Sequence, residues 1–278
     1  MARLVAGTGA PGAETRGRCL AGATHGRSEL LVRRGRFEIP ERIGEDRPET
    51  VAYGIGDEMD SRARGARNAD PSSGLARFLH RAGQLKFVPR TGWLHRGVPP
   101  AEAESVADHT WRMALLAWLA AADQPELDRA RVLQLALIHD LAEAVTGDLP
   151  PYDPDEIAGV DEATRQELLN RRQVRSEERA AAKRAAEAAA MADLLADLPQ
   201  GLADELGALW AELQEGQTPE ARFVKQADKL ETYLQSREYG EGHPDRPMAS
   251  FAAEVAEVID APALVALREA IRRQWPDG

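Results

Sequence analysis

The sequence predicts an all-α fold, in which a helical bundle begins near residue 75 and continues almost to the end of the chain. The chain has 278 residues and is 43% hydrophobic but only 5% aromatic, so its core must consist mainly of Leu, Val and Ala. Segments rich in Ala and Leu, with few β-branched runs, favour helices over strands. From Leu75 onward, apolar residues recur at helical spacing, whereas no such stripe persists before that point.

Residues 1–74 differ in composition from the rest of the chain. They are rich in Gly, Arg, Pro, Ser and Thr, as in "GTGAPGAETRGR" and "SRARGARNADPSSG". Such segments bury too little apolar surface to fold, so we expect a disordered or weakly structured extension. An alternative is that translation starts at Met59. We therefore divide the chain into an extension, 1–74, and a helical domain, 75–278.

The first predicted helices flank a Pro- and Gly-rich loop at 88–100. The helix at 74–87 has an apolar face formed by Leu75, Phe78, Leu79, Ala82 and Leu85. The next helix, 105–122, begins with Ser105 and Asp108, which have the spacing of an N-cap and its capping-box acid. Its predicted core face consists of Trp111, Leu115, Trp118, Leu119 and Ala122.

The remaining elements are also predicted helices. Asp128 can cap a helix that continues to about Val145, where "TGDLPPYDP" ends it. A long Ala-, Glu- and Arg-rich helix follows at about 161–197, and another spans 201–216. Thr218 and Pro219 start a helix with Pro at its first position. Its core face is Phe223, Val224, Ala227, Leu230 and Leu234, and two shorter helices, 249–259 and 262–274, complete the chain.

Composition excludes several classes of function. Cys19 is the single cysteine, so an internal disulfide and a cysteine-based metal site are excluded. No apolar run approaches the roughly 18 residues that span a bilayer, and the apolar run at the N-terminus is too short for a signal peptide, so we expect a cytoplasmic protein. The net charge is -11, and residues 1–75 are nearly neutral, with 12 basic and 11 acidic residues. The acidic helical domain argues against binding a nucleic acid polymer, whereas a small anionic substrate would need a local cation, either a metal or an Arg.

Four residues with metal-binding side chains lie in or beside apolar helical faces. They are His109, His139, Asp140 and Asp228. Neighbouring residues of a helix point about 100° apart, so His139 and Asp140 can approach one ion from the same side. Two imidazoles and two carboxylates suit Mn, Co, Fe, Ni or Zn better than Mg or Ca, and such an ion would activate a water molecule as a nucleophile. The alternative is that these residues are hydrogen-bonded core residues with no ion.

The segments that carry these residues resemble a known family. "VADHTWRMA", "LIHDLAEAVTGDLPPYD" and "FVKQADKLETYLQSREY" are similar to the His, His-Asp and Asp segments of the HD-domain metal phosphohydrolases. With "GQLKFVPRTGWLHRGV", the resemblance is closer to the HD-domain 5'-deoxynucleotidases. It covers roughly Leu75 to Tyr239, in the family's order, and it is specific because "VPRTGW" and "EAVTGD" are not required for metal binding alone.

The resemblance implies roles for individual residues. It implies that His109, His139, Asp140 and Asp228 bind a single divalent ion and that Glu143 lies beside the metal-bound water. It also implies that Arg90 contacts the substrate phosphate, that Trp93 and Asp148 shape the nucleotide pocket, and that the protein is a homodimer. General chemistry agrees, since a planar guanidinium holds phosphate oxygens by two contacts, and an acid that is not a ligand is free to move protons.

Each of these residues also has a structural interpretation. Arg90 can pair with a surface acid, Trp93 can pack in the core, Glu143 can face solvent, and Asp148 can cap the following turn. The basic run "RRQVRSEERAAAKR", 171–184, is expected to be a solvated helix face. The dimer surface is left open between the helix that contains Trp210 and the C-terminal helical pair.

The favoured hypothesis is a metal-dependent phosphomonoesterase that removes the 5'-phosphate of nucleoside monophosphates, with deoxyribonucleotides preferred. One alternative keeps the metal and changes the substrate, giving a deoxynucleoside triphosphohydrolase or a phosphodiesterase. The other alternative is a non-catalytic helical scaffold with a structural metal.

Overall fold

The computed structural model describes residues 70–276, and these residues form helices and connecting loops. Residues 1–69, which include most of the extension expected to be disordered and the alternative start at Met59, lie outside the described residues. The predicted boundary of the extension at residue 74 falls inside the first described helix, which Asp70 caps through the backbone N–H groups of Ser72 and Ser73. Among the described helices, none combines the length and the apolar character needed to cross a bilayer.

The all-α prediction is confirmed, since the described residues contain no strand and a single isolated bridge, between Pro89 and Ser105. The helices, in chain order, are α2 (Pro71–Ala82), η1 (Gly83–Phe87), α3 (Thr91–His95), α4 (Val106–Ala120), η2 (Ala121–Asp123), α5 (Arg129–Ile138), α6 (Glu143–Thr146), α7 (Pro154–Ala158), α8 (Glu162–Asn170), α9 (Glu177–Leu195), α10 (Gln200–Glu215), α11 (Pro219–Gly240), α12 (Ala249–Val258) and α13 (Pro262–Gln274).

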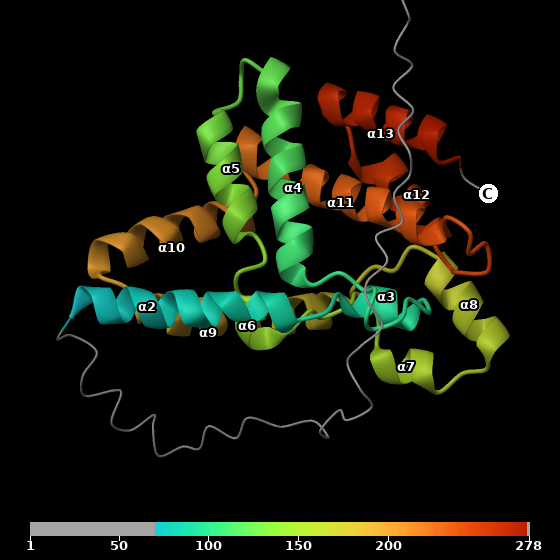
Figure 1. Ribbon diagram of the computed structural model, residues 1–278, viewed down its shortest axis with the longest axis horizontal. Helices are drawn as coiled ribbons and strands as arrows, with labels where there is room; N and C mark the ends of the chain where they lie inside the picture. Colours follow the sequence, from blue (N-terminus) through green and yellow to red (C-terminus); the bar gives the residue numbers. More distant parts are fainter. Residues whose placement is uncertain (1–69, 277–278) are drawn as a thin grey trace, which may run out of the picture. The chain divides into compact units, whose positions relative to one another are not determined.

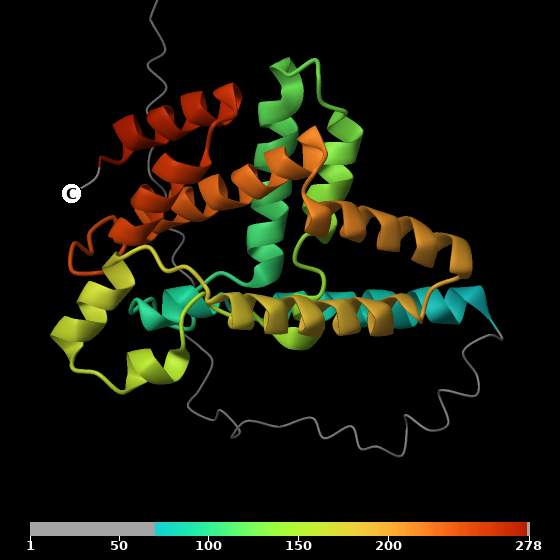
Figure 2. The ribbon, with the colours of Figure 1, turned by 180° about the vertical axis from the view of Figure 1, so that it is seen from behind.

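The helices of the described part lie in two directions. In Figure 1, α4 and α5 stand side by side, and α11 crosses behind α4 with α12 and α13 beyond it. Helices α2 and α9 run alongside each other across the foot of α4, with α6 next to them (Figures 1 and 2). Short helices α3, α7 and α8 gather at one end of this pair, near the end of α11. The region where α4, the α5–α6 junction and α11 meet therefore lies at the centre of the helical domain.

Two hydrophobic clusters hold this arrangement together. The larger one joins α4, α5, α10, α11, α12 and α13, and includes Met113, Leu135, Phe223, Leu230 and Leu264. The second joins α2, η1, α6 and α9. Together they explain why a chain poor in aromatic residues still folds: most of the buried side chains are Leu, Val, Ala and Met.

The predicted helix starts are confirmed by their capping bonds. Ser105 and Asp108 form a capping box at the start of α4, with the Ser hydroxyl and the Asp carboxylate each accepting a backbone N–H bond. Asp128 accepts two backbone N–H bonds at the start of α5. Thr218 caps α11, and Pro219 occupies its first position. Each of these bonds satisfies amide groups that a helix leaves unpaired at its start.

Two predicted helices are interrupted in the structure. The helix expected from Asp128 to Val145 ends at Ile138, and α6 starts anew at Glu143. The Nδ1 atom of His139 lies 2.8 Å from the carbonyl oxygen of Ala136, a carbonyl that the next turn of an α-helix would use. Backbone bonds then run three residues back, as from Glu143 to Asp140, which tightens the turn.

The long helix expected at 161–197 is also divided. Helix α8 ends at Asn170 and α9 begins at Glu177, with Ser176 as the N-cap of α9. The sequence signal for this break was the serine followed by two glutamates, a typical helix start inside the charged run. The structure adds α3 and α7, two short helices that the Pro- and Gly-rich composition of their segments concealed.

The predicted core face of α4 is wrong. Trp111 is 67% exposed and Leu119 is 55% exposed, while Leu115, Trp118 and Ala122 are also exposed. The buried face instead carries His109, Met113, Ala114 and Ala117. Helix α4 is apolar on both faces, so hydrophobicity alone could not identify the side that packs. On α2, Phe78 is buried as expected, but Leu75 and Leu79 are exposed.

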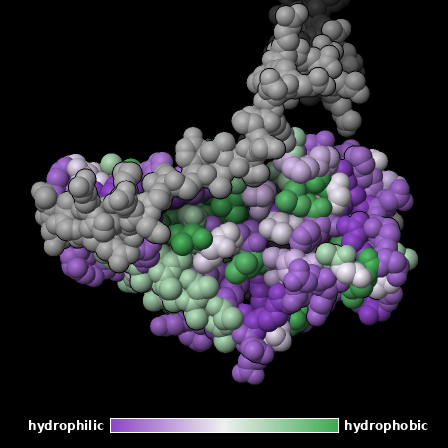
Figure 3. All heavy atoms as spheres, turned by 90° about the horizontal axis from the view of Figure 1, so that it is seen from below, coloured by the Kyte–Doolittle hydropathy of each residue, from purple (hydrophilic) through white to green (hydrophobic). Residues whose placement is uncertain are grey.

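Helix α9 is rich in alanine, but most of its alanines are exposed and not part of the core. It leaves alanines 181, 182, 185, 186, 188 and 189 exposed. The view from below shows pale green, weakly hydrophobic residues beside purple polar ones on the side of the molecule where α2 and α9 lie (Figure 3). Only the end of α9, at Ala190, Met191 and Leu194, enters the core.

Candidate active site

The four predicted metal ligands come from three segments that meet at the centre of the domain. His109 lies on α4, His139 and Asp140 lie at the α5–α6 junction, and Asp228 lies on α11. The Nε2 atom of His109 is 3.2 Å from Oδ1 of Asp228 and 3.3 Å from Nε2 of His139. The Oδ2 atom of Asp140 is 2.9 Å from Nε2 of His139 and 3.8 Å from Nε2 of His109. The structure therefore brings all four side chains together.

Hydrogen bonds on the far side of each imidazole orient the two rings. Nδ1 of His139 faces the carbonyl oxygen of Ala136, and Nδ1 of His109 faces the carboxylate of Glu231, which is completely buried. Because an oxygen acceptor requires a protonated Nδ1, each ring is left with Nε2 as the free nitrogen. Both free nitrogens lie near the carboxylates of Asp140 and Asp228, and an oxygen bonded to Nδ1 orients metal-binding histidines in the same way.

The donor set fits a divalent transition metal. His109, His139 and Asp228 each offer one atom, and these atoms all lie within 4.8 Å of one another. Two imidazole nitrogens and two carboxylates suit Mn, Co, Fe, Ni or Zn. The carboxylates are ionised, since the favourable effects of Lys229 and His109 on Asp228, and of His139 and Arg90 on Asp140, outweigh burial and hold both pKa values well below the usual range.

His109 itself shows how strongly its neighbours favour positive charge at this point. Burial and the nearby Arg90 both lower the pKa of His109, but hydrogen bonds to Asp228 and Glu231 outweigh them and raise it to about 9. A proton on Nε2 and a cation at the same place are stabilised by the same carboxylates. The surroundings of His109 are therefore prepared for a positive charge between α4 and α11.

Glu143 lies beside this cluster without being part of it. Its side chain is buried, and its Oε2 atom has no hydrogen-bond partner among the described residues. Its Oε1 atom is 3.5 Å from Nζ of Lys183 on α9. Burial, Asp140 and Asp148 raise the pKa of Glu143 well above the usual range, although Lys183 opposes them. A carboxyl group with a raised pKa and an unused oxygen is suited to give and take protons.

Arg90 reaches the cluster because its backbone is paired with the start of α4. The N–H of Arg90 donates to the carbonyl oxygen of Glu104, and the N–H of Val106 donates to that of Val88. Arg90 precedes His109 by 19 residues, and this short antiparallel pairing holds it close enough for its charge to act on the imidazole of His109. Its guanidinium lies 3.4 Å from Oδ2 of Asp140 and donates to the hydroxyl of Thr232 at 3.1 Å.

Comparisons with known proteins agree with this arrangement. A family model described as "HD domain" matches residues 82–263. This chain belongs to the HD-domain family. It is 38% identical to the 5'-deoxynucleotidase HDDC2 of Mus musculus, in an alignment that covers 70% of this chain and 85% of that protein. It is 35% identical to the 5'-deoxynucleotidase hdd1 of Schizosaccharomyces pombe, over 62% of this chain and 75% of that protein.

A solved structure shares this fold. A conserved hypothetical protein from Pyrococcus furiosus superposes on this HD domain with a TM-score of 0.51 and 29% identity. The match covers 71% of this chain and 99% of that protein. Nearly the whole of that protein therefore has the helical arrangement described above.

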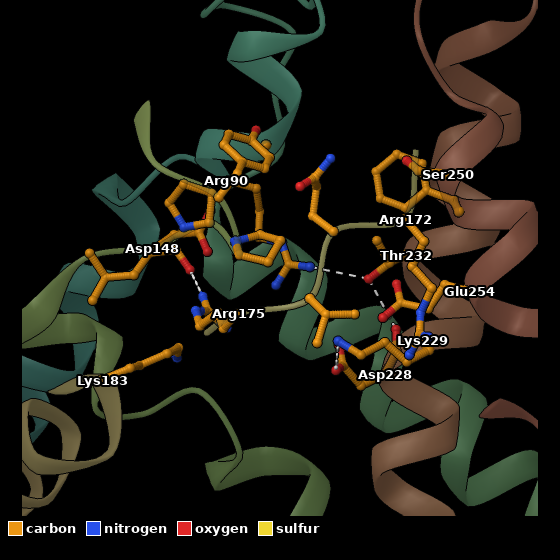
Figure 4. Close-up of a pocket in the computed structure, with 18 of the residues that line it drawn as sticks. Arg90, Asp148, Arg172, Arg175, Lys183, Asp228, Lys229, Thr232, Ser250 and Glu254 are labelled. Atoms are coloured by element: carbon orange, nitrogen blue, oxygen red, sulfur yellow. Dashed lines mark hydrogen bonds and ion pairs between the residues drawn. The ribbon is translucent and has the colours of Figure 1, made fainter. Parts of the chain in front are cut away.

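The HD domain holds a pocket next to the four convergent side chains. Its volume is about 590 Å³, and it is lined by residues of α3, α6, α9, α11, α12 and the loops between them. Asp140, Glu143 and Asp228 line it together with Arg90, so the candidate metal centre opens into this space. Figure 4 shows Arg90 reaching toward Thr232, with Asp228 and Lys229 below them. A cavity of this volume is within the range of small-molecule sites.

Trp93 lines the pocket and is also a core residue. It is 2% exposed, its Nε1 donates to a carboxylate oxygen of Glu104, and its ring packs against Tyr239 and Phe251. Both interpretations made from the sequence are therefore compatible with its position. Because the indole is almost completely buried and its N–H is hydrogen-bonded, it is a rigid part of the pocket wall.

Asp148 also lines the pocket, but part of its carboxylate is occupied. Its Oδ2 accepts a bond from the backbone N–H of Thr91 at 2.6 Å, at the start of α3. The cap is thus on α3 and not on the turn that follows Asp148 in sequence. Gly147 has φ of +72°, a conformation that favours glycine, and it turns the chain after α6 so that Asp148 reaches α3.

Several residues around the site were missed by the sequence analysis. Glu231 and Arg112 are the clearest, because each follows a predicted ligand by three residues on the same helix face. Nε of Arg112 donates to Glu231 at 2.7 Å, and the guanidinium also contacts Glu238 and Gln235. The sequence places an Arg and a Glu of opposite charge on the apolar faces of two helices. They can be recognised as a pair only when α4 and α11 are known to pack together.

The expectation that residues 171–184 form a solvated face is also wrong in part. Arg171, Arg172, Arg175, Lys183 and Arg184 all line the pocket. The interruption between α8 and α9 causes this difference, because it lets the connector fold over the pocket instead of continuing as an exposed helix.

Proposed function

We propose that this HD-domain protein is a metal-dependent phosphomonoesterase that hydrolyses the 5'-phosphate of deoxynucleoside monophosphates. The observation that carries the proposal is the convergence of two imidazole Nε2 atoms and two carboxylates, next to a buried acid and an arginine, in one pocket. The relatives named 5'-deoxynucleotidases support the substrate class.

His109, His139, Asp140 and Asp228 would hold one divalent ion, of Mn, Co, Fe, Ni or Zn. Such an ion supplies Lewis acidity and lowers the pKa of a coordinated water. Arg90 would bind the non-bridging phosphate oxygens with its two-pronged guanidinium, because its backbone is fixed by the pairing with Glu104. Glu143, which is buried and carries an unused Oε2, would accept the proton of the attacking water and deliver one to the leaving oxygen.

The nucleoside would occupy the rest of the pocket. Trp93 offers a rigid aromatic edge beside it. Asp148 has a second carboxylate oxygen beyond the one that caps α3, and this oxygen would accept a hydroxyl hydrogen of the sugar. A sugar whose hydroxyl groups do not match this acceptor would lose that bond, which is how such a site selects between sugars.

A panel of nucleotides tests this function. We expect phosphate release from deoxynucleoside 5'-monophosphates with Mn, Co or Zn, and much slower release from di- and triphosphates. A preference for triphosphates or for diesters would instead identify the triphosphohydrolase or phosphodiesterase alternative. The Asp140→Asn variant should lose turnover while it keeps its helical circular dichroism spectrum, and turnover at the parent rate would exclude the proposed chemistry.

We also propose that the protein is a homodimer and that the exposed face of α4 forms its interface. Trp111, Leu115, Trp118 and Leu119 follow each other at helical spacing on this face, and all four are exposed. Trp210, which the sequence analysis considered for this role, instead packs against the core. Light scattering should give a dimer for the parent and a folded monomer for Trp111→Glu, whereas a monomeric parent at micromolar concentration would exclude the dimer.

A further inference from the structure

The pocket concentrates positive charge in a protein that is acidic as a whole. The chain has a net charge of -11, yet its pocket lining includes eight basic residues among those described and five acidic ones. The basic residues are Arg90, Arg96, Arg171, Arg172, Arg175, Lys183, Arg184 and Lys229. Such a lining favours an anionic ligand, so the question is which of these cations are available to it.

Most of these cations already have acidic partners. Arg171 pairs with Glu167, Arg172 with Glu257, and Lys229 with Asp228. Lys183 pairs with both Glu143 and Glu187, and Arg90 pairs with Asp140. Their charges are therefore partly neutralised before any ligand enters.

Three pocket cations have no carboxylate partner in the described part of the chain. Arg96 is 6% exposed, and carbonyl and hydroxyl oxygens surround its guanidinium, so it is a structural residue. Arg184 is exposed, so water solvates it. Arg175 is half-buried, and its one hydrogen bond to a described residue goes to the carbonyl oxygen of Leu149.

Arg175 therefore holds a charge that its surroundings do not fully compensate. Burial lowers the pKa of its guanidinium, and Glu187, Asp148 and Glu143 oppose this effect from a distance. Removing a cation from water without an ionic partner costs free energy, and an anion that enters the pocket would recover part of it. The bond to Leu149 fixes one arm of the guanidinium, so its other nitrogens remain free to bind.

We propose that Arg175 is a substrate-binding residue that holds the phosphate group from the side of the pocket opposite Thr232, so that the phosphate lies between Arg175 and Arg90. This inference rests on the proposed function and adds a specific contact to it. In Figure 4, Arg175 lies with Asp148 on one side of the pocket, while Thr232, Lys229 and Asp228 lie on the other. A phosphate monoester carries nearly two negative charges on three oxygens. The charge of the proposed divalent ion would be offset by Asp140 and Asp228, so one guanidinium, already shared with Asp140, leaves phosphate charge uncompensated.

Arg179 provides a matched control. It lies one turn further along the chain and donates at 3.1 Å to the carbonyl oxygen of Tyr152, in the same loop that Arg175 holds at Leu149. It pairs with Asp153 and does not line the pocket. A role limited to tying down this loop would therefore make the two arginines equivalent.

The test compares Arg175→Met, Arg175→Gln, Arg175→Lys and Arg179→Met, all loaded with Mn. Binding of inorganic phosphate is measured by calorimetry, and KM and kcat are measured with a deoxynucleoside monophosphate. Losing a charge-assisted hydrogen bond should weaken phosphate binding and raise KM by about 10- to 100-fold in Arg175→Met and Arg175→Gln. Gln keeps a donor for Leu149, so it separates charge from loop anchoring. Lys should recover part of the loss, and Arg179→Met should stay within about twofold of the parent.

Several results would overturn the inference. These are phosphate affinity and KM in Arg175→Gln within twofold of the parent, equal effects in Arg175→Met and Arg179→Met, or a parent that binds no phosphate. If Arg175→Met fails to fold, the comparison between Gln and Lys still decides the question. A parent that binds phosphate through Arg175 but releases none from any nucleotide would instead contradict the proposed function alone.

Discussion

At the scale of single residues, the orientation of His109 depends on a side chain that does not face the pocket. Glu231 is completely buried, and it lies between Nδ1 of His109 and the guanidinium of Arg112. Burial raises the pKa of Glu231, but His109 and Arg112 outweigh this effect, so the pKa is lowered and Glu231 stays ionised. An ionised acceptor at Nδ1 keeps the proton there and leaves Nε2 free.

Replacing Glu231 with Gln should therefore weaken metal binding. An amide accepts the Nδ1 proton less strongly and can present its NH₂ group instead, so we expect about a 10- to 100-fold loss of affinity for Mn or Co. The affinity is measured by calorimetric titration of each variant with the metal. Glu238→Gln is the control, because Glu238 contacts Arg112 but not His109. Equal affinities in the two variants would show that Glu231 does not orient the ring.

Glu143 is the residue to replace when testing proton transfer. Glu143→Gln keeps the size and the burial of the side chain but cannot exchange a proton, so kcat should fall about 10²- to 10⁴-fold with little change in KM. Steady-state kinetics with a deoxynucleoside monophosphate measure both values. A kcat close to that of the parent would mean that another group carries the proton.

At the scale of helices, the sequence predicted most helix starts and few interruptions. Capping depends on residues near one another in the chain, so Ser105, Asp128 and Thr218 could be read directly. The break after Ile138 depends on a side chain taking a backbone carbonyl, and the buried face of α4 depends on which helices surround it. Neither is visible in local spacing. The four candidate ligands could be predicted because metal binding is restricted to few residue types, while Glu231, Arg112 and Arg175 required the packing of distant helices.

The contact between α2 and α9 gives a prediction at this scale. A Cβ atom added at Gly74 would lie 2.2 Å from the carbonyl oxygen of Asp197, which is backbone and cannot move alone. Gly74→Ala should therefore separate the two helices and destabilise the protein by about 1–3 kcal/mol.

The matched variant is Gly83→Ala, because a Cβ there meets nothing within 4 Å and its φ of −62° is helical. This change should be neutral or stabilise by about 0.4–1 kcal/mol. Urea denaturation of both variants measures the difference. Equal stabilities would mean that α2 and α9 are further apart than described.

At the scale of the whole domain, the candidate metal centre connects helices that are distant in sequence. His109 and His139 are 30 residues apart, and Asp228 comes from the much later α11. An ion held by these residues would bind only the folded chain, in which the distant segments meet, and it would therefore stabilise the folded state. Stability and metal content should thus be linked.

Removal of the metal tests this link. At an ion concentration about 100 times Kd, binding contributes about 2.7 kcal/mol, which corresponds to about 5–10 °C in Tm for a domain of this size. We expect a chelator to lower Tm by that amount and added Mn or Co to restore it. Asp228→Asn should melt at nearly the same temperature with and without metal. If the chelator leaves the Tm of the parent unchanged, the ion contributes little to the stability of the fold.

The interruption between α5 and α6 has a consequence for anyone who engineers this protein. A continuous helix from Arg129 to Thr146 would restore regular backbone bonding, and by the usual rules it would be an improvement. It would also rotate Asp140 and Glu143 relative to His139, whose ring is anchored by the carbonyl oxygen that the break leaves free. Selection for thermal stability alone would therefore be expected to favour a continuous helix here and to yield a protein that is more stable but inactive.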